Sequence, residues 1–122
     1  MKYYADTDFF LAIFKEKDWL KAKAMSLAHH NISTSVSTAI ELLLLAKKHS
    51  LEPERTMSDL LTHAVVEGIL PNQLLAAAHY VQVENLTVLD AFHAAYCGNR
   101  TIISSDQRFD KLGMRRIKLE SK

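Results

Sequence analysis

The sequence predicts an α/β fold, a three-layer α/β/α sandwich with a short, mostly parallel central sheet. Short apolar or β-branched segments alternate with segments of helical periodicity along the chain, which is the pattern of strands joined by crossover helices. No hairpin signal such as Asn-Gly joins two strand-like segments. The length of 122 residues suits one domain of typical size, so a single domain is expected over residues 1–122.

The N-terminal part is expected to form one strand and two helices. Residues 2–5 resemble a short aromatic strand, and Asp6 follows at a position that can cap a helix over the apolar run Phe9–Phe14. A second helix with one buried face, which includes Trp19, is expected within residues 15–30. The chain should therefore pass from a strand into a helix at Asp6.

The middle of the chain is expected to be mostly helical. After a short strand over residues 31–35, Ser37 or Thr38 can cap a helix over residues 39–49. The apolar surface of that helix runs nearly all round it, which predicts deep packing. Pro53 fits the first turn of the next helix, which is expected to continue to Gly68.

The C-terminal half is expected to contain two helices and two strands. The expected elements are a helix from Pro71 through Val81, a helix over residues 88–96 capped by Thr87 and ended by Gly98, and strands over residues 101–103 and 115–119. In a parallel α/β sheet, ligands bind at the carboxyl ends of the strands. That edge is where functional side chains are expected.

Composition limits the possible functions only weakly. The chain has 15 basic and 14 acidic residues, so its charge neither favours nor excludes a nucleic-acid partner. The single cysteine, Cys97, fits a reducing compartment and is expected to be buried. The sequence shows no signal peptide and no apolar run approaching the roughly 20 residues that span a bilayer. A cytoplasmic protein without a membrane partner is expected.

Four acidic residues stand where this fold would bring them to one edge of the sheet. Asp6 and Asp106 follow strand segments, Glu41 lies in the helix after the second strand, and Asp90 lies in the first turn of its helix. Glu41 is the most informative, because it interrupts a run of isoleucine and leucine, where a charge needs a partner or a shifted pKa. Such a cluster repels itself unless a cation or a proton neutralises it.

Each of these acids lies in a longer motif. In chain order the motifs are Tyr4-Ala5-Asp6-Thr7-Asp8-Phe9-Phe10, Ile32-Ser33-Thr34-Ser35-Val36-Ser37-Thr38-Ala39-Ile40-Glu41-Leu42, Leu89-Asp90-Ala91-Phe92-His93-Ala94-Ala95 and Ile102-Ile103-Ser104-Ser105-Asp106-Gln107-Arg108-Phe109-Asp110. They resemble the motifs of the PIN domains, metal-dependent ribonucleases that include the VapC-type toxins of prokaryotic toxin–antitoxin pairs. Each motif alone is weak, but together, in this order and over the whole chain, they are specific. The one departure is Ser105, where many relatives have Asn.

The resemblance implies a PIN-like fold and an endoribonuclease that hydrolyses RNA phosphodiester bonds with Mg²⁺ or Mn²⁺. The catalytic and metal-binding residues that it implies are Asp6, Glu41, Asp90 and, directly or through water, Asp106. It also implies that Thr7, Ser104 and Ser105 orient these carboxylates by hydrogen bonds. Whether one ion or two bind is left open by the sequence.

The same resemblance implies partners. A toxin of this family is usually held inactive by a small antitoxin protein, and it often forms a homodimer through helices. The apolar segments Ile40–Ala46 and Leu74–Val81 could supply a self-association surface, although core packing also explains much of their apolar character. RNA, an antitoxin and a second copy of the chain are therefore the expected partners.

Simpler interpretations exist for individual residues. Any one of the acids could be a helix or turn cap, and Asp8 is expected to cap or to support the site, so it is left out of the ligand set. His93 is expected to be a packing or surface residue. The late basic residues could follow an RNA backbone or form a solvated face; they are Arg100, Arg108, Lys111, Arg115 and Arg116.

Two other functions remain open. Asp6-Thr7-Asp8 after a strand also resembles the nucleophile and acid pair of haloacid-dehalogenase-type phosphatases, which form an aspartyl-phosphate. Phe10 and the short chain argue against that interpretation. The other alternative is a PIN-fold scaffold or interaction protein without activity, against which the four intact acids weigh.

Overall fold

The computed structural model describes residues 2–121, and its central feature is a five-stranded sheet in the order β3-β2-β1-β4-β5. The elements in chain order are β1 (Tyr3–Ala5), α1 (Thr7–Phe14), α2 (Lys21–Leu27), β2 (Ile32–Ser35), α3 (Val36–Leu45), α4 (Pro53–His63), β3 (Val65–Glu67), α5 (Pro71–Gln82), α6 (Val88–Cys97), β4 (Thr101–Ser104), the 3₁₀ helix η1 (Gln107–Leu112) and β5 (Arg116–Lys118). All the strand pairs are parallel. The carboxyl ends of the strands therefore meet at one edge of the sheet.

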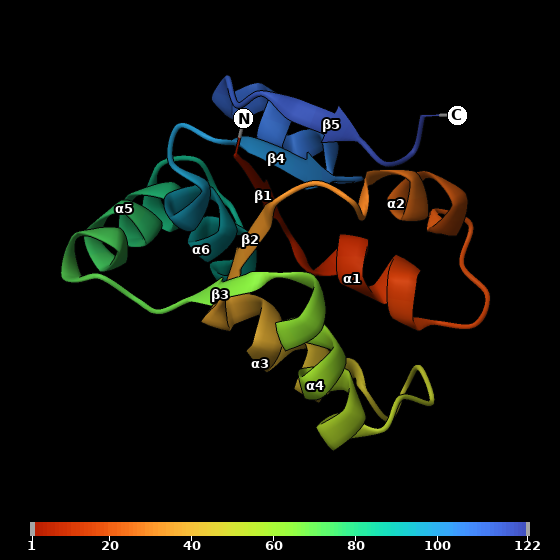
Figure 1. Ribbon diagram of the computed structural model, residues 1–122. Coiled ribbons are helices and arrows are strands. Elements are labelled where there is room, and N and C mark those ends of the chain that lie inside the picture. Colours follow the sequence, from red (N-terminus) through yellow and green to blue (C-terminus); the bar gives the residue numbers. More distant parts are fainter. Residues whose placement is uncertain (1, 122) are drawn as a thin grey trace.

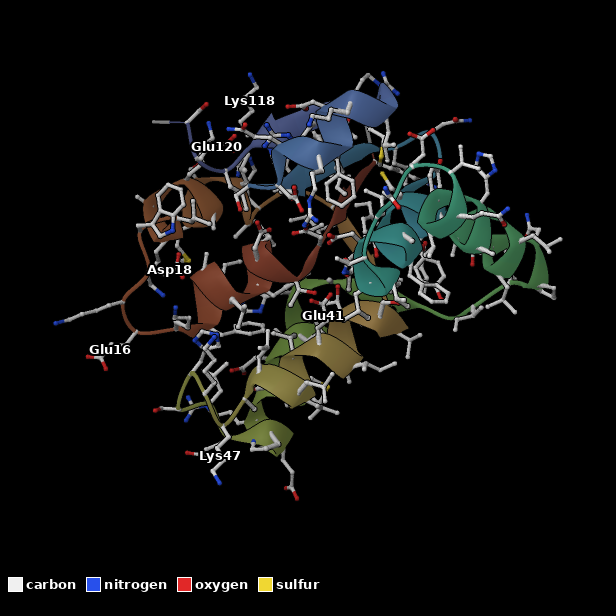
Figure 2. The ribbon with its side chains drawn as sticks, turned by 180° about the vertical axis from the view of Figure 1, so that it is seen from behind. Glu16, Asp18, Glu41, Lys47, Lys118 and Glu120 are labelled. Carbon is white, nitrogen blue, oxygen red and sulfur yellow. The ribbon has the colours of Figure 1, made fainter. Side chains whose placement is uncertain are left out.

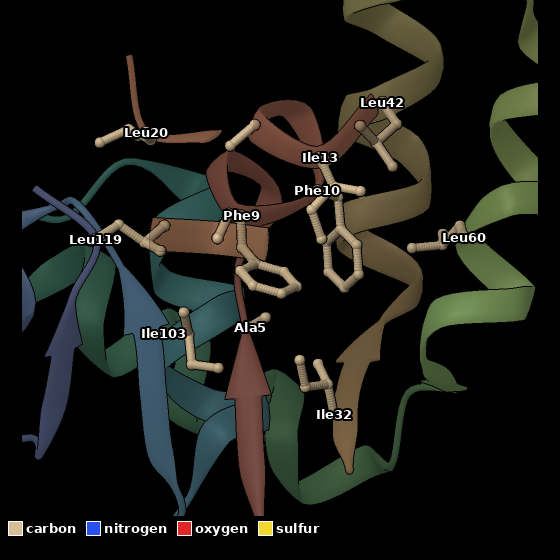
Figure 3. Close-up of a cluster of buried hydrophobic side chains, with 12 residues drawn as sticks. Ala5, Phe9, Phe10, Ile13, Leu20, Ile32, Leu42, Leu60, Ile103 and Leu119 are labelled. Atoms are coloured by element: carbon tan, nitrogen blue, oxygen red, sulfur yellow. The ribbon is translucent and has the colours of Figure 1, made fainter. Parts of the chain in front are cut away.

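Helices cover both faces of this sheet (Figure 1). On β1, Ala5 belongs to the core under α1, α2 and α4, where Phe9 of α1 lies over Ala5 and Phe10 lies on the side of Leu42 and Leu60 (Figure 3). Tyr4 faces the opposite way, into the core under α5 and α6. This alternation follows from the two-residue period of a strand. The predicted three-layer α/β/α sandwich is confirmed.

The second helix is much shorter than predicted. Instead of residues 15–30, α2 covers Lys21–Leu27, and the side chain of Trp19 is 77% exposed rather than buried. The preceding residues form a turn, in which Asp18 accepts a hydrogen bond from the backbone of Leu20 and pairs with Lys15. Asp side chains stabilise turns in this way, and the helical periodicity of the segment conceals it.

The helix that carries Glu41 begins earlier and packs less deeply than predicted. It follows β2 without a loop, starting at Val36 with Ser35 as its N-cap residue, rather than at Ala39. Only one side faces the core, through Leu42, whereas Ile40 and Leu44 are exposed. The apolar character of α3 therefore exceeds what the core of this chain uses, and a hydrophobic surface remains on the outside.

The helix from Pro53 ends at His63 rather than at Gly68, because the chain turns into β3, a strand that the sequence analysis missed. β3 pairs with β2 at the edge of the sheet. Its three residues are too few to show a strand period. The other predicted elements, α5 with Pro71 in its first turn, α6 with Thr87 as its N-cap, β4 and β5, are present. No helix within residues 2–121 combines the length and apolar character needed to cross a membrane.

Candidate metal centre

All four predicted acids line one pocket of about 350 Å³ at the carboxyl edge of the sheet. Asp6 follows β1, Glu41 extends from α3, Asp90 lies in the first turn of α6 and Asp106 follows β4. Figure 2 shows Glu41 in the space between α1, α3 and α6. Other lining residues are Thr7, Asp8, His93, Ser105 and Arg108. The fold thus gathers acids that are far apart in sequence.

Asp6 is the most buried acid of the pocket, with only 6% of its surface exposed. It caps α1 by accepting a hydrogen bond from the backbone of Asp8 at 3.2 Å, and the hydroxyl of Ser104 donates to its Oδ2 at 2.6 Å. Burial, followed by the nearby charge of Asp8, raises the pKa of Asp6 well above its usual value. A carboxylate with a raised pKa in a polar pocket favours a cation beside it.

Asp8 also lines the pocket, although it is not among the ligands predicted from the sequence. Its Oδ2 accepts hydrogen bonds from both the backbone and the hydroxyl of Ser105. Its Oδ1 is buried without a hydrogen-bond partner. Ser105 was expected to orient one of the four predicted acids, but it holds Asp8 instead, because the chain turns after β4 and points its hydroxyl at α1. An unpartnered buried carboxylate oxygen is available to a ligand.

Glu41 is held by a hydrogen-bond chain that reaches into the core. Thr7 donates to its Oε1 at 2.8 Å, as predicted, and Nε2 of His93 lies 2.6 Å from the same oxygen. The other ring nitrogen, Nδ1, is 2.8 Å from the hydroxyl of Tyr4, which also contacts Ser35. An ionised Glu41 accepts only, so the contact requires a proton on Nε2. In a neutral ring, Nδ1 then accepts from Tyr4, and every group has a partner.

His93 is buried as expected for a packing residue, with 1% of its surface exposed, but it also lines the pocket and fixes Glu41. Its position one turn after Asp90 in α6 was the available signal. The partner on α3 could not be read from the sequence. Burial raises the pKa of Tyr4, so its hydroxyl keeps its proton and can donate to the ring.

Asp90 and Asp106 share one arginine. Nη2 of Arg108 lies 2.6 Å from Oδ2 of Asp90 and 2.8 Å from Oδ2 of Asp106. Burial of Asp106 would raise its pKa, but the hydrogen bonds and charge of Arg108 outweigh that effect and lower it. For Asp90, burial prevails and the pKa is raised, although Thr87 and Arg108 act against it. Arg108 is thus a pocket residue rather than part of an open basic surface.

The remaining late arginines are also engaged within the chain. Arg100 pairs with Glu67, Arg116 pairs with Asp110 and Glu120, and Arg115 donates to the backbone oxygen of Asn99. Side-chain exposure of Arg116 is only 1%. Neither a solvated face nor an open RNA track describes Arg100 and Arg116, because carboxylates of the same chain bind their guanidinium groups.

Cys97 is buried, as predicted, and its thiol donates to the backbone oxygen of Arg100 at 3.2 Å. Burial raises the pKa of Cys97 to about 12. At neutral pH the group is therefore a protonated thiol, which is a poor nucleophile. Cys97 is also absent from the residues that line the acidic pocket, which argues against a catalytic role.

The donors in the acidic pocket fit a hard divalent cation. They are carboxylate oxygens, which Mg²⁺ and Mn²⁺ prefer, and they include the orphaned Oδ1 of Asp8. Over the described residues, however, no group of three or more His, Cys, Asp or Glu side chains stands ready at metal-binding distances. The side chains are bonded elsewhere, Glu41 to His93 and the outer acids to Arg108. Binding by all four acids requires these partners to adjust.

A larger hollow of about 790 Å³ lies near the opposite, amino edge of the sheet. Its lining includes Lys2, His30 and His63 with the Glu67–Arg100 ion pair, so its one acid already has a cation. Size does not decide between the two hollows. The smaller one gathers five carboxylates and a single arginine at the edge where α/β folds bind ligands, and it is the candidate site.

Comparison with known proteins identifies related folds. The family model described as the PIN domain matches residues 3–114. VapC20 from Mycobacterium tuberculosis, described as a toxin that cleaves the sarcin-ricin loop, superposes with a TM-score of 0.81 at 20% identity, over 95% of this chain and 98% of that one. No curated protein sequence matches the chain.

Two toxin–antitoxin structures are also similar. A complex from Klebsiella pneumoniae gives a TM-score of 0.76 at 18% identity, covering 98% of this chain and 99% of that one. DNA-bound VapBC from Salmonella typhimurium gives 0.73 at 18% identity, covering 98% of each chain. At these identities the structural likeness shows the shared fold.

Proposed function

The chain belongs to the PIN domain family, and from that premise we propose that it is an endoribonuclease that hydrolyses RNA with Mg²⁺ or Mn²⁺ held at the acidic pocket. One observation carries the proposal, namely the convergence of Asp6, Asp8, Glu41, Asp90 and Asp106 on a single pocket. The raised pKa of Asp6 supports it, because this carboxylate lacks a positive partner.

The proposed ligands are Asp6, Glu41, Asp90 and Asp106, with Oδ1 of Asp8 as a further donor. A bound divalent ion would supply charge neutralisation at the scissile phosphate and a more acidic water. The chain's own contribution is positioning. Ser104 holds Asp6, while Thr7 and His93 hold Glu41, so the two carboxylates present fixed oxygens.

We propose further that the chain acts in the cytoplasm as a toxin and that a small antitoxin protein is its partner. The similar folds found in toxin–antitoxin complexes support this proposal. So does the apolar surface on the outside of α3 and α5, where Leu44 is 72% and Leu75 is 77% exposed. The same surface supports a homodimer, which light scattering of the purified chain tests, with Leu44→Glu and Leu75→Glu expected to give monomer.

The test of the ribonuclease proposal is cleavage of a pool of structured RNAs by purified chain with Mg²⁺ or Mn²⁺. We expect cleavage that EDTA stops, and strong loss in Asp6→Asn and Asp90→Asn. Asp59→Asn is the matched control, because it neutralises an exposed acid on α4 that faces Arg55 at 3.9 Å, outside the pocket. Circular dichroism checks that each variant folds.

The outcomes separate the candidate functions. Equal cutting by wild type and by the pocket variants would refute the site. Release of phosphate from a small ester, without RNA cleavage, would indicate a phosphatase. Neither reaction, with stable binding of a protein partner, would indicate a scaffold.

A further inference from the structure

Arg108 occupies the outer opening of the acidic pocket. Its Nη2 contacts Asp90 at 2.6 Å and Asp106 at 2.8 Å, while its Nε lies 3.1 and 3.2 Å from the two oxygens of Asp106. The acids come from different elements, α6 and the turn after β4. A guanidinium fork is suited to bridging carboxylates in this way.

Local structure holds the arginine there. Asp106 is the N-cap of η1 and accepts a hydrogen bond from the backbone of Arg108 at 2.9 Å. Asp90 is fixed in turn by the hydroxyl of Thr87 at 2.9 Å. The backbone of Arg108 is therefore anchored beside the acids, whereas its side chain is 50% exposed and has solvent on one side. An exposed ion pair of this kind is weak enough to open.

The positive charge in the pocket is unevenly placed. Among the described residues, Arg108 is the one lysine or arginine that pairs with Asp90 and Asp106. No lysine or arginine side chain of these residues bonds to Asp6, Asp8 or Glu41. The hydrogen bonds to the inner acids come from serine, threonine, histidine and the backbone. An arginine thus balances the carboxylate charge at the opening of the pocket, whereas no arginine or lysine does so for the inner acids.

A divalent ion and the guanidinium cannot use the same oxygens together. Mg²⁺ binds carboxylate oxygens directly at about 2.0–2.1 Å, and Oδ2 of both Asp90 and Asp106 is already engaged by Nη2. Two cations at one pair of oxygens also repel each other. Metal binding through these two oxygens therefore requires Arg108 to leave.

We propose that Arg108 is a tethered counter-ion of the metal site, which neutralises Asp90 and Asp106 in the metal-free chain and which a divalent cation must displace in order to bind through their Oδ2 atoms. The proposal rests on the proposed function, because it assumes that the pocket takes a divalent cation. Under this proposal Arg108, which is not one of the acids, sets the metal concentration at which the site becomes occupied.

The direct test is the affinity for Mn²⁺, measured by electron paramagnetic resonance on the full chain. We expect Arg108→Gln to bind Mn²⁺ about tenfold more tightly than wild type, since the competing cation is gone. Arg108→Lys keeps the charge but loses the fork, so its affinity is expected between the two. The metal concentration for half-maximal RNA cleavage should fall in the same order.

Arg55→Gln is the matched control. It removes the same charge from an exposed ion pair on α4, the one between Arg55 and Asp59, which is outside the pocket. Its Mn²⁺ affinity should equal that of wild type. A tenfold gain in this variant too would attribute the effect to net charge and overturn the proposal.

Displacement itself is visible by nuclear magnetic resonance. The side-chain Nε–H signal of Arg108, identified by its loss in Arg108→Gln, should shift when Mg²⁺ is added, because its hydrogen bonds to Asp106 break. Mg²⁺ binding without a shift, or unchanged Mn²⁺ affinity in Arg108→Gln, overturns the counter-ion role while leaving the metal site in place. Absence of Mn²⁺ binding in both wild type and Arg108→Gln overturns this inference and the proposed function together.

Discussion

The inner and outer halves of the acidic pocket differ in how the negative charge of their carboxylates is balanced. The inner half, Asp6, Asp8 and Glu41, is held without lysine or arginine, through donors such as Ser104, and the pKa of Asp6 is raised. The outer half, Asp90 and Asp106, is neutralised by Arg108 from the same chain, and the pKa of Asp106 is lowered. The contrast shows where the chain has left charge uncompensated, and the inner half is where a cation would be attracted most strongly.

The largest expected difference between the halves is in RNA cleavage. Asp6→Asn should lower kcat about a thousandfold, because it removes an uncompensated carboxylate at the centre of the sheet edge. Asp106→Asn should lower kcat only about tenfold, since this acid already has a partner in Arg108. Single-turnover kinetics at saturating metal measure both. Equal losses would break the distinction between inner and outer acids.

A second difference concerns how Glu41 is held. His93→Ala leaves Tyr4 and Glu41 without their shared partner in a buried place, which should cost about 2–4 kcal/mol of unfolding free energy and lower kcat about 10- to 100-fold. His93→Gln keeps a side-chain donor and should recover part of kcat. Denaturant unfolding and cleavage kinetics at a temperature where the variants are folded measure the two effects.

His79 supplies the control for that prediction, since it is exposed on α5 and lies outside the pocket. His79→Ala should leave kcat and stability close to wild type. The contrary outcome is a His93→Gln variant that is as stable as wild type but loses as much kcat as His93→Ala. In that case the imidazole would have a role that a positioning donor does not explain.

The third difference is a pH dependence of stability in metal-free buffer. Because folding raises the pKa of Asp6, the folded chain keeps a proton that the unfolded chain releases above about pH 4. The contribution of Asp6 to the free energy of unfolding is therefore greatest below that pH and is lost as pH rises through the folded pKa. Asp6→Asn should remove this component, and Tm of wild type and variant measured with EDTA across pH 4–8 shows it as a widening gap in favour of the variant. A constant gap would contradict the raised pKa.

The smallest expected effect lies in the outer half. Thr87→Ala removes the N-cap of α6 and the hydroxyl that contacts Asp90, which should cost about 1 kcal/mol. RNA cleavage should change less than about threefold, because Asp90 keeps either Arg108 or the cation that replaces it as a partner. Thr62→Ala is the control, since the Thr62 hydroxyl bonds only within α4. A large loss of cleavage in Thr87→Ala would show that the outer half depends on the cap rather than on the arginine.

The sequence predicted the placement of the acids well because local signals fix it. Asp6 follows a strand and caps a helix, and Thr87 caps the helix that bears Asp90, and both contacts are present. The side-chain contacts within each half of the pocket could not be predicted from the sequence. His93 meets Glu41 across 52 positions, and Arg108 meets Asp90 across 18, so neither contact follows from a local pattern.

The errors in the fold have a similar origin. Trp19 and Ile40 each belong to an apolar pattern with helical spacing, and both are exposed. Such spacing does not say whether another element covers that side of a helix. β3 has three residues and exists because β2 offers it an edge to pair with. Tertiary context decides such segments more than their own composition does.

The position of β1 in the middle of the sheet determines when its neighbouring strands become available during synthesis of the chain. Asp6 is made early, but its partner Ser104 follows 98 residues later, which at typical synthesis rates is a delay of roughly 5–20 s. Until then β1 lacks β4 as a neighbour, and Asp6 lacks the hydroxyl that orients it. A nascent chain released before Ser104 therefore carries Asp6 without the hydroxyl and the strand that lie beside it in the folded protein.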